Sequence, residues 1–188
     1  MSASSAPFGF RPAYCPSGLA RARKYTIASG YATGIQSGSP VMLEGTGGTI
    51  TIGGTTGDLL GIFAGCEYID STGKPTVSNQ WIAGTTVLSG TTVTAWVFDG
   101  PLTVFEVQNV GSVTQANIGE EANTSTISGS TFTGLSSTTL AAPNGTTQSQ
   151  WRIIGFGQGI DNAPGDSNTI VQVTLAMSQL AFANKVGV

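Results

Sequence analysis

Residues 91–108 read TTVTAWVFDGPLTVFEVQ, and this stretch decides the fold class. Side chains alternate in character along residues 93–98 and again along 102–107, with the turn sequence Asp-Gly-Pro at 99–101 between them. A period of two places neighbouring side chains on opposite faces of a β-strand. We therefore predict a β-hairpin over residues 91–108. Large apolar side chains lie on both of its faces, so we expect at least one strand to be covered on both sides, by a second sheet or by another subunit.

The remainder of the chain carries further strand patterns separated by turn sequences. We expect short strands at residues 24–29, 40–43, 48–52, 58–68, 151–156 and 169–177. Val, Ile and Thr far outnumber Leu, Glu and Lys, and β-branched side chains favour strands over helices. The predicted fold is all-β, an antiparallel sandwich or barrel of jelly-roll type. An extended N-terminal arm over residues 1–24 is expected to precede a single β-rich domain over residues 25–188.

The predicted arm combines prolines with aromatic and basic side chains. Pro7, Pro12 and Pro16 are spaced too closely for a helix or a central strand. Residues 1–26 hold four basic residues and no acidic one, whereas residues 27–188 hold three basic and ten acidic residues. We expect the arm to bind an acidic protein surface through its arginines, with its aromatic side chains as anchors. The candidate binding residues are Phe8, Phe10, Arg11, Tyr14, Arg21, Arg23 and Lys24.

Two other roles for the arm stay open at this point. It could bind nucleic acid, but four positive charges without a recognition helix or a stacking sheet are sparse, and the acidic body would repel phosphate. We therefore expect no nucleic-acid partner. The arm could also fold back on its own domain, where its aromatic side chains would be buried.

Composition excludes several classes of enzyme. The chain has no histidine, and only 9% of its residues are charged. Ser-His-Asp and Cys-His catalysis and every histidine-containing zinc or haem site are thereby excluded. A hydrophobic content of 39% is too high for a disordered tail. We expect a folded protein that is not an enzyme and that uses no cofactor or metal.

Three weaker patterns could carry chemistry. Glu67 and Glu106 each lie in an apolar strand and could form the carboxylate pair of a glycosidase, although Glu106 could equally face solvent or pair with an arginine. The loop 161–168, DNAPGDSN, gathers oxygen-bearing side chains that suit a hard cation, but it lacks EF-hand spacing, and Asx and Pro-Gly turns explain it without a metal. Gly155 and Gly157 lack the helix and lysine of a phosphate-binding loop.

Cysteine content and the first residues bear on the cellular compartment. Cys15 and Cys66 are expected to be free thiols, with a single bridge between them as the alternative. The first residues, MSASSAPFGFRP, contain no apolar signal region, and no stretch is long and apolar enough for a membrane helix. We therefore expect synthesis in the cytoplasm and no membrane partner.

Residues 123–145 are rich in Ser and Thr, with isolated apolar residues such as Phe132 and Leu140. We interpret this segment as a polar strand with long turns at the rim of the protein. The alternative is an exposed edge or loop that becomes ordered on a partner.

Four stretches of the chain resemble one family of proteins. They are SAPFGFRPAYCPSGLARARKYTIASGYATGIQSGSPV (5–41), LLGIFAGCEYIDSTGKPTVSNQW (59–81), FEVQ (105–108) and WRIIGFGQGIDNAPGDSNTIVQVTL (151–175). They are similar to the head decoration, or capsid cement, proteins encoded beside the major capsid gene of tailed bacteriophages. The resemblance spans most of the chain in the same order, with little of it in residues 110–150.

The resemblance implies a structural virion protein. Such a protein binds the outer surface of the assembled capsid, often as a homotrimer at three-fold or quasi-three-fold positions, and bridges neighbouring subunits of the major capsid protein. We accordingly expect localisation on the capsid surface after synthesis in the host cytoplasm. The alternative function is that of a β-rich tail or fibre protein that recognises a host surface glycan.

Overall fold

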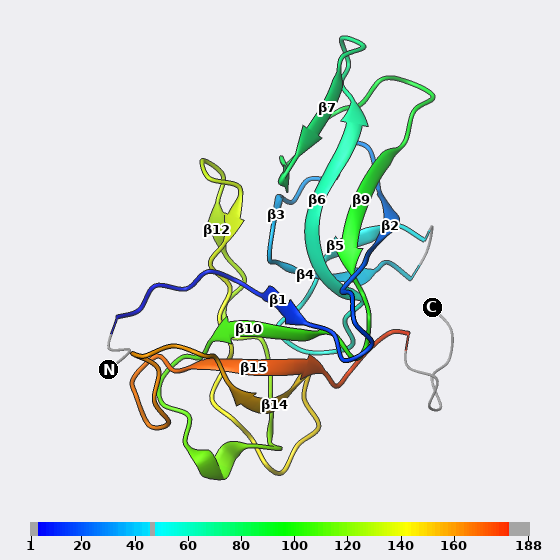
Figure 1. Ribbon diagram of the computed structural model, residues 1–188. Coiled ribbons are helices and arrows are strands. Elements are labelled where there is room, and N and C mark those ends of the chain that lie inside the picture. The colour runs from blue at the N-terminus through cyan, green and yellow to red at the C-terminus, as the bar shows by residue number, and fades with distance from the viewer. Residues whose placement is uncertain (1–3, 46–47, 181–188) are drawn as a thin grey trace.

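The structure of this chain is a computed structural model that describes residues 4–45 and 48–180 (Figure 1). Its strands are β1 (Arg11–Tyr14), β2 (Ala22–Ile27), β3 (Ile35–Gln36), β4 (Pro40–Leu43), β5 (Ile50–Ile52), β6 (Gly61–Ile69), β7 (Pro75–Ser78), β8 (Gln80–Trp81), β9 (Val93–Phe98), β10 (Val104–Gln108), β11 (Glu121–Ala122), β12 (Gly129–Ser130), β13 (Leu135–Ser136), β14 (Trp151–Phe156) and β15 (Ile170–Leu175). A 3-10 helix, η1, spans Gln115–Asn117. The strands pair antiparallel within several sheets, so the predicted all-β, antiparallel class is confirmed.

A five-stranded sheet forms the lower part of the molecule in Figure 1, with the strand order β1-β10-β15-β14-β11. The sequence of β15 explains how one face becomes apolar, since Val171, Val173 and Leu175 alternate with polar residues and are all buried. They pack in one core with Trp151 of β14 and Phe105 of β10, whose rings meet edge to face with centroids 5.9 Å apart.

A six-stranded sheet forms the upper part, with the order β2-β9-β6-β4-β5 and β7 paired on the outer half of β6. A bridge between Thr26 and Thr49 brings the start of β5 back beside β2. The sheet therefore curls around a second core, which includes Ile27, Phe63 and Trp81.

The predicted hairpin over 91–108 is wrong, although both of its strands are present. β9 pairs with β2 and β6, whereas β10 pairs with β1 and β15, so the Asp-Gly-Pro turn connects two sheets instead of closing a hairpin. Asp99 is 2% exposed, and its carboxylate accepts hydrogen bonds from side chains of β2. The turn is thereby held against the upper sheet while Pro101 and the following residues lead into the lower one.

β10 is buried on both faces, as its apolar pattern predicted, but its second cover is the chain's own N-terminal segment. Phe105 and Val107 face the lower core, and Val104 and Gln108 on the opposite face are also buried. The Gln108 side chain clamps the N-terminal backbone: its Oε1 accepts from the N–H of Ala6 (3.0 Å), and its Nε2 donates to the carbonyl of Ser4 (3.2 Å).

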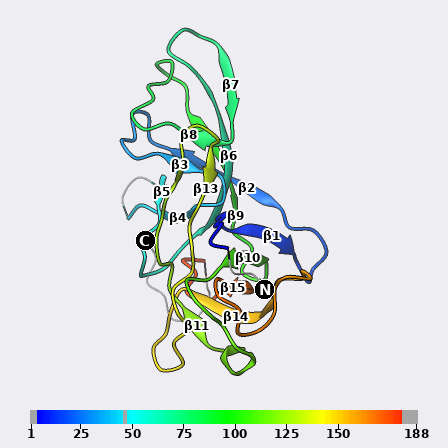
Figure 2. The same ribbon diagram turned by 90° about the vertical axis from the view of Figure 1, so that its left-hand side faces the viewer.

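The N-terminal segment, residues 4–14, lies against both sheets (Figure 2). Phe10 is 1% exposed and stacks on Trp151 with ring centroids 4.3 Å apart, and its N–H donates to the carbonyl of Gly38. Gly9 makes this approach possible: its φ is +73°, and a Cβ there would lie 2.7 Å from the Cβ of Ser136. β1 then adds to the edge of the lower sheet beside β10.

The other predicted strands agree closely with the structure. β4 and β14 have the predicted bounds, and β2, β5, β6 and β15 differ from them by a few residues at their ends. Residues 123–145 form short bridges and the hairpin β12–β13 instead of one polar strand, and only part of the segment lies at the rim, because Leu140 is buried in the lower core. Within residues 4–45 and 48–180, no helix has the length and apolar character that crossing a membrane requires.

Candidate protein-binding surface

The seven predicted binding residues fall in three places of the fold. Phe10 lies in the lower core and is closed off from solvent. Phe8, Arg11 and Tyr14 lie on or beside β1, at the edge of the lower sheet. Arg21, Arg23 and Lys24 lie at the start of β2, at the edge of the upper sheet. The exposed members are therefore carried by two adjacent sheet edges.

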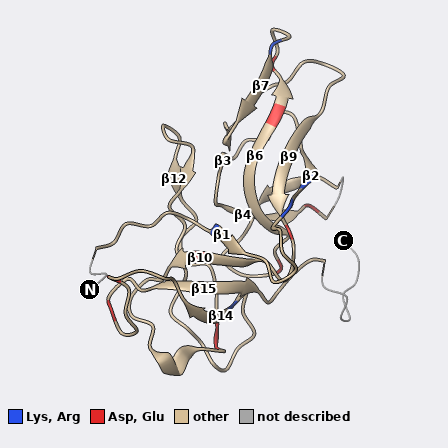
Figure 3. Ribbon diagram, in the orientation of Figure 1, with Lys and Arg blue, Asp and Glu red and all other residues tan. Residues whose placement is uncertain are grey.

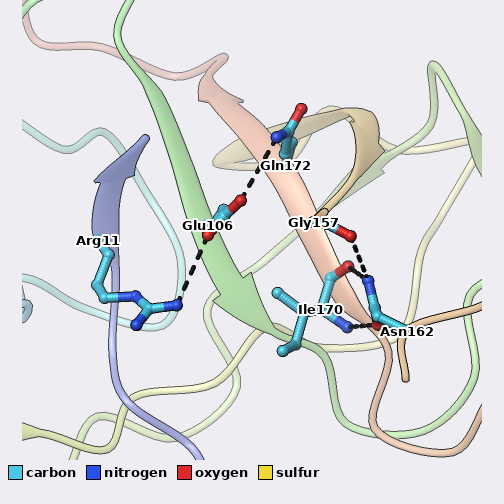
Figure 4. A network of polar contacts seen from close by, with 6 residues as sticks. All are labelled: Arg11, Glu106, Gly157, Asn162, Ile170 and Gln172. Atoms are coloured by element: carbon cyan, nitrogen blue, oxygen red, sulfur yellow. Dashed lines mark hydrogen bonds and ion pairs between the residues drawn. The ribbon is translucent and has the colours of Figure 1, made fainter. Parts of the chain in front are cut away.

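Arg11 is held in place on β1 by two neighbours. Its guanidinium lies 3.9 Å from the ring centroid of Phe8, and its Nη2 lies 3.6 Å from Oε2 of Glu106 on β10 (Figure 4). The other carboxylate oxygen of Glu106 accepts a long hydrogen bond, 3.5 Å, from the side chain of Gln172. The Arg11 side chain stays 59% exposed, so this ion pair contributes little to stability and leaves guanidinium donors available to a partner.

A buried carboxylate, Asp99, organises the start of β2. Nε of Arg23 lies 2.6 Å from Oδ2 of Asp99, and the hydroxyl of Tyr25 donates to the same oxygen. Burial, followed by this hydrogen bond, raises the pKa of Tyr25 to about 12, and the hydrogen bond to Asp99 raises the pKa of Arg23. Arg23 therefore neutralises an internal acid, even though 60% of its side chain is exposed.

A groove of about 380 Å³ opens beside Arg23, where the chain passes twice between the two sheets. We call it the junction groove; its lining is Cys15, Ser17, Leu19, Arg21, Ala22, Arg23, Asp99, Gly100 and Thr103. Leu19 is 69% exposed in this groove. Tyr14 on the neighbouring β1 edge and Leu102 in the inter-sheet turn are also largely exposed. Apolar and basic side chains thus share one surface.

The charge of this surface comes mainly from Arg21 and Lys24. Figure 3 shows how sparse charged residues are along the ribbon, and it marks basic residues at the lower end of β2. Neither Arg21 nor Lys24 forms an ion pair with any residue that the structure describes. Nζ of Lys24 lies 4.9 Å from the ring centroid of Trp96, on the outer face of the upper sheet. Arg21 beside exposed apolar side chains suits an acidic protein surface, and Lys24 adds a positive charge on the other face of β2.

The candidate catalytic and metal-binding residues are used in other ways. Glu67 lies on β6 of the upper sheet and Glu106 on β10 of the lower sheet, where Arg11 pairs with it. In the 161–168 loop, the side chain of Asn162 donates to the carbonyls of Gly157 and Ile170 and accepts from the N–H of Ile170 (Figure 4). These bonds hold the loop to residues at the ends of β14 and β15, but they are not the expected Asx turn, in which the side chain binds the backbone two residues on. Among the described residues, no group of three or more His, Cys, Asp or Glu could hold a metal ion.

Both cysteines are free, as predicted. Cys66 faces the upper core, and burial raises its pKa to about 12. Cys15 lies at the junction groove, where a hydrogen bond with the hydroxyl of Ser17 lowers its pKa.

Sequence reasoning missed the exposed apolar residues of this surface and the buried acid beneath it. Leu19 lies in turn-like sequence with no periodic pattern, and Leu102 was included in the alternation of residues 102–107, which gave no sign that it is exposed. Asp99 was assigned to a turn, where Asp is normally exposed, and only its position at a crossover between sheets explains its burial. No protein-family model, curated protein or solved structure matches this chain, so residues and geometry alone carry the functional assignment.

Proposed function

We propose that this chain is a structural protein of a tailed-bacteriophage virion that binds the outer surface of the capsid and bridges subunits of the major capsid protein. The observation that carries the proposal is the basic, apolar surface of the junction groove and the start of β2. Arg21 and Lys24 supply the charge, and Leu19, Tyr14 and Leu102 supply the apolar contact area.

Stabilisation of the shell would follow from mass action. A protein that binds the assembled lattice, but not its separated subunits, lowers the free energy of the lattice with every copy bound. Many copies add up, so each contact has to contribute only a few kcal/mol. We further propose that the copies act as homotrimers. Sedimentation or native mass measurements should then give three times the 19.1 kDa of one chain.

The decisive experiment measures binding of the purified protein to phage heads that lack it. Charge reversal at Arg21→Glu and Lys24→Glu should weaken binding at least about tenfold, and binding of the wild type should weaken as salt rises. Lys74→Glu is the matched control, because Lys74 is an exposed cation in the distant β6–β7 turn. Point variants are preferable to deletion of residues 1–24, which would remove Phe10 from the core.

Two results would contradict the proposal. One is a wild-type protein that does not bind heads or does not raise their resistance to heat or chelator. The other is equal loss of binding in the Lys74→Glu control, which would point to a general effect of charge.

One observation favours the alternative of a tail or fibre protein that recognises a glycan. A polar hollow of about 330 Å³ is lined by Glu120, Glu121, Asn144 and Arg152, among others, and such side chains hydrogen-bond sugar hydroxyls. Arg152 and Glu121 are already paired at 2.7 Å, which leaves fewer groups for a ligand. Virion protein gels separate the two functions: decoration requires a copy number close to that of the major capsid protein, whereas a fibre requires a few dozen copies or fewer.

A further inference from the structure

The hairpin β12–β13 lies at one side of the molecule in Figure 1, and its turn is hydrogen-bonded to residues in and beside β3 and β8. Phe132 lies in its turn and is 96% exposed. The hairpin β12–β13 lies apart from the segment between β1 and β2, which lines the junction groove, in both Figure 1 and Figure 2, so one copy could touch two bodies at once. A single exposed apolar side chain needs no explanation by itself, so the case for Phe132 rests on how the turn that carries it is held.

The tip is held by residues in and beside the separate two-stranded sheet β3–β8. The side-chain amide of Asn79 donates to the carbonyl of Thr133 (3.0 Å), and that of Gln80 donates to the carbonyl of Thr131 (2.8 Å). The N–H of Ser37 donates to the carbonyl of Gly134 (3.0 Å). Both neighbours of Phe132 are therefore fixed, and little conformational freedom of the backbone remains to be lost on binding.

The same hydrogen bonds allow the tip to be buried in an interface without leaving its carbonyls unpaired. The carbonyls on either side of Phe132 already have donors, so burying them leaves no new unpaired group. Residues 128–137 contain no charged side chain. Directly after the turn, Leu135 is 54% exposed and lines an apolar hollow together with Phe8. The surface around the ring is thus uncharged, rigid and partly apolar.

We propose that Phe132 is the anchor of a second contact with the partner protein, in which its ring enters an uncharged, apolar pocket. This inference rests on the proposed function and adds to it the second surface that bridging requires. A glycan is disfavoured, because sugar hydroxyls need hydrogen-bond partners and the polar groups beside the ring are already engaged. A lipid surface is disfavoured too, because a single apolar side chain without neighbouring cations is too weak a membrane anchor.

The test compares Phe132→Ala with wild type in binding to heads that lack the protein. We expect affinity to fall about 30-fold or more, as for a buried aromatic at an interface, and thermal stability to stay unchanged, since the ring contacts almost nothing in the free protein. Ile160→Ala is the matched control, because Ile160 is an equally exposed apolar side chain in a different loop. It should bind as wild type does.

A second pair of variants tests rigid presentation. Asn79→Ala and Gln80→Ala leave the ring in place but remove the amides that hold its neighbours, so affinity should fall several-fold while Phe132 remains necessary. If wild type binds heads and Phe132→Ala binds equally well, the anchor is refuted and the proposed function stands. If wild type does not bind heads, both the Phe132 anchor and the proposed function are refuted. Binding of wild type, but not of Phe132→Ala, to phosphatidylcholine vesicles would also overturn the inference, in favour of a lipid surface.

Discussion

Replacing Phe10 with alanine tests whether the N-terminal segment is part of the folded core. The ring is 1% exposed, stacks on Trp151 at 4.3 Å between centroids, and belongs to the same core cluster as Phe105. If the segment packs as described, Phe10→Ala removes a buried side chain from the lower core. If instead the segment acts as a free arm in solution, the substitution changes almost nothing.

The magnitude follows from burial. A phenylalanine that buries about 200 Å² contributes roughly 5 kcal/mol at about 25 cal/mol per Å². Substitutions of buried Phe by Ala cost about 3–5 kcal/mol once the residual cavity is counted. The stacked geometry with Trp151 adds about 0.5–1.5 kcal/mol to what the ring contributes. Because the segment is terminal, it can detach while the rest of the protein stays folded. The loss in free energy of unfolding then cannot exceed the free energy with which the segment binds the rest of the fold.

The assay is equilibrium unfolding in urea, followed by tryptophan fluorescence. Phe10→Ala should lower the free energy of unfolding by about 3–5 kcal/mol, whereas Phe132→Ala, which removes a 96% exposed ring, should change it by less than about 0.5 kcal/mol. Phe10→Leu keeps much of the apolar volume and should fall between them. A loss below about 1 kcal/mol for Phe10→Ala, equal to that of the Phe132 control, would refute the packing of this segment.

Three further predictions concern the junction between the sheets and the upper sheet. Folding raises the pKa of Tyr25 to about 12, so the protonated hydroxyl stabilises the folded state. This contribution is fully present below pH 10 and is lost as the pH rises through 12. The urea midpoint should therefore fall more steeply between pH 10 and 12 in wild type than in Tyr25→Phe. Asp99→Ala should lower the free energy of unfolding by about 2–3 kcal/mol, because Tyr25 loses its acceptor, whereas Asp99→Asn, which keeps an acceptor, should cost less. Gly61→Ala should cost about 3 kcal/mol, because its Cβ would lie 2.2 Å from the carbonyl oxygen of Phe98, whereas Gly45→Ala, in open space, should stay within about 0.5 kcal/mol of wild type.

Each of these predictions has a result that contradicts it. Parallel alkaline profiles for wild type and Tyr25→Phe would show that another group governs stability above pH 10. Equal losses for Asp99→Ala and Asp99→Asn would show that the acceptor is irrelevant. Equal stabilities for the two glycine variants would show that β6 and the end of β9 are not as close as described.

The absence of histidine bears on how the protein responds to pH. Histidine is the side chain whose ordinary pKa lies between pH 5 and 8, and this chain has none. A change of binding over that interval therefore cannot come from a histidine of this chain.

Local pattern was sufficient to locate most strands. In β15, a period of two places Val171, Val173 and Leu175 on one face, and this alternation is visible without any knowledge of neighbouring strands. The bounds of β4 and β14 were likewise set by the residues within them. The two free cysteines also follow from local chemistry.

Strand pairing was not available from local pattern, and this is where the hairpin prediction failed. The turn at 99–101 is compatible with a hairpin and with a crossover between sheets, because its local chemistry is the same in both. The choice depends on long-range partners: β2 and β6 take β9, β1 and β15 take β10, and Asp99 is buried by Arg23 and Tyr25. None of these contacts is encoded within the hairpin stretch itself.

The candidate surfaces show the same distinction between features that local sequence predicts and features that depend on long-range contacts. The sequence by itself determined an all-β class, a basic and aromatic N-terminal region and a polar rim, because composition and period are local properties. Only the tertiary structure decided that Phe10 is core while Arg21 is surface, and that Phe132 is held rigidly in solvent by Asn79 and Gln80. The physical reason is that burial and hydrogen-bond satisfaction depend on which distant segments meet, and side-chain type alone does not specify that.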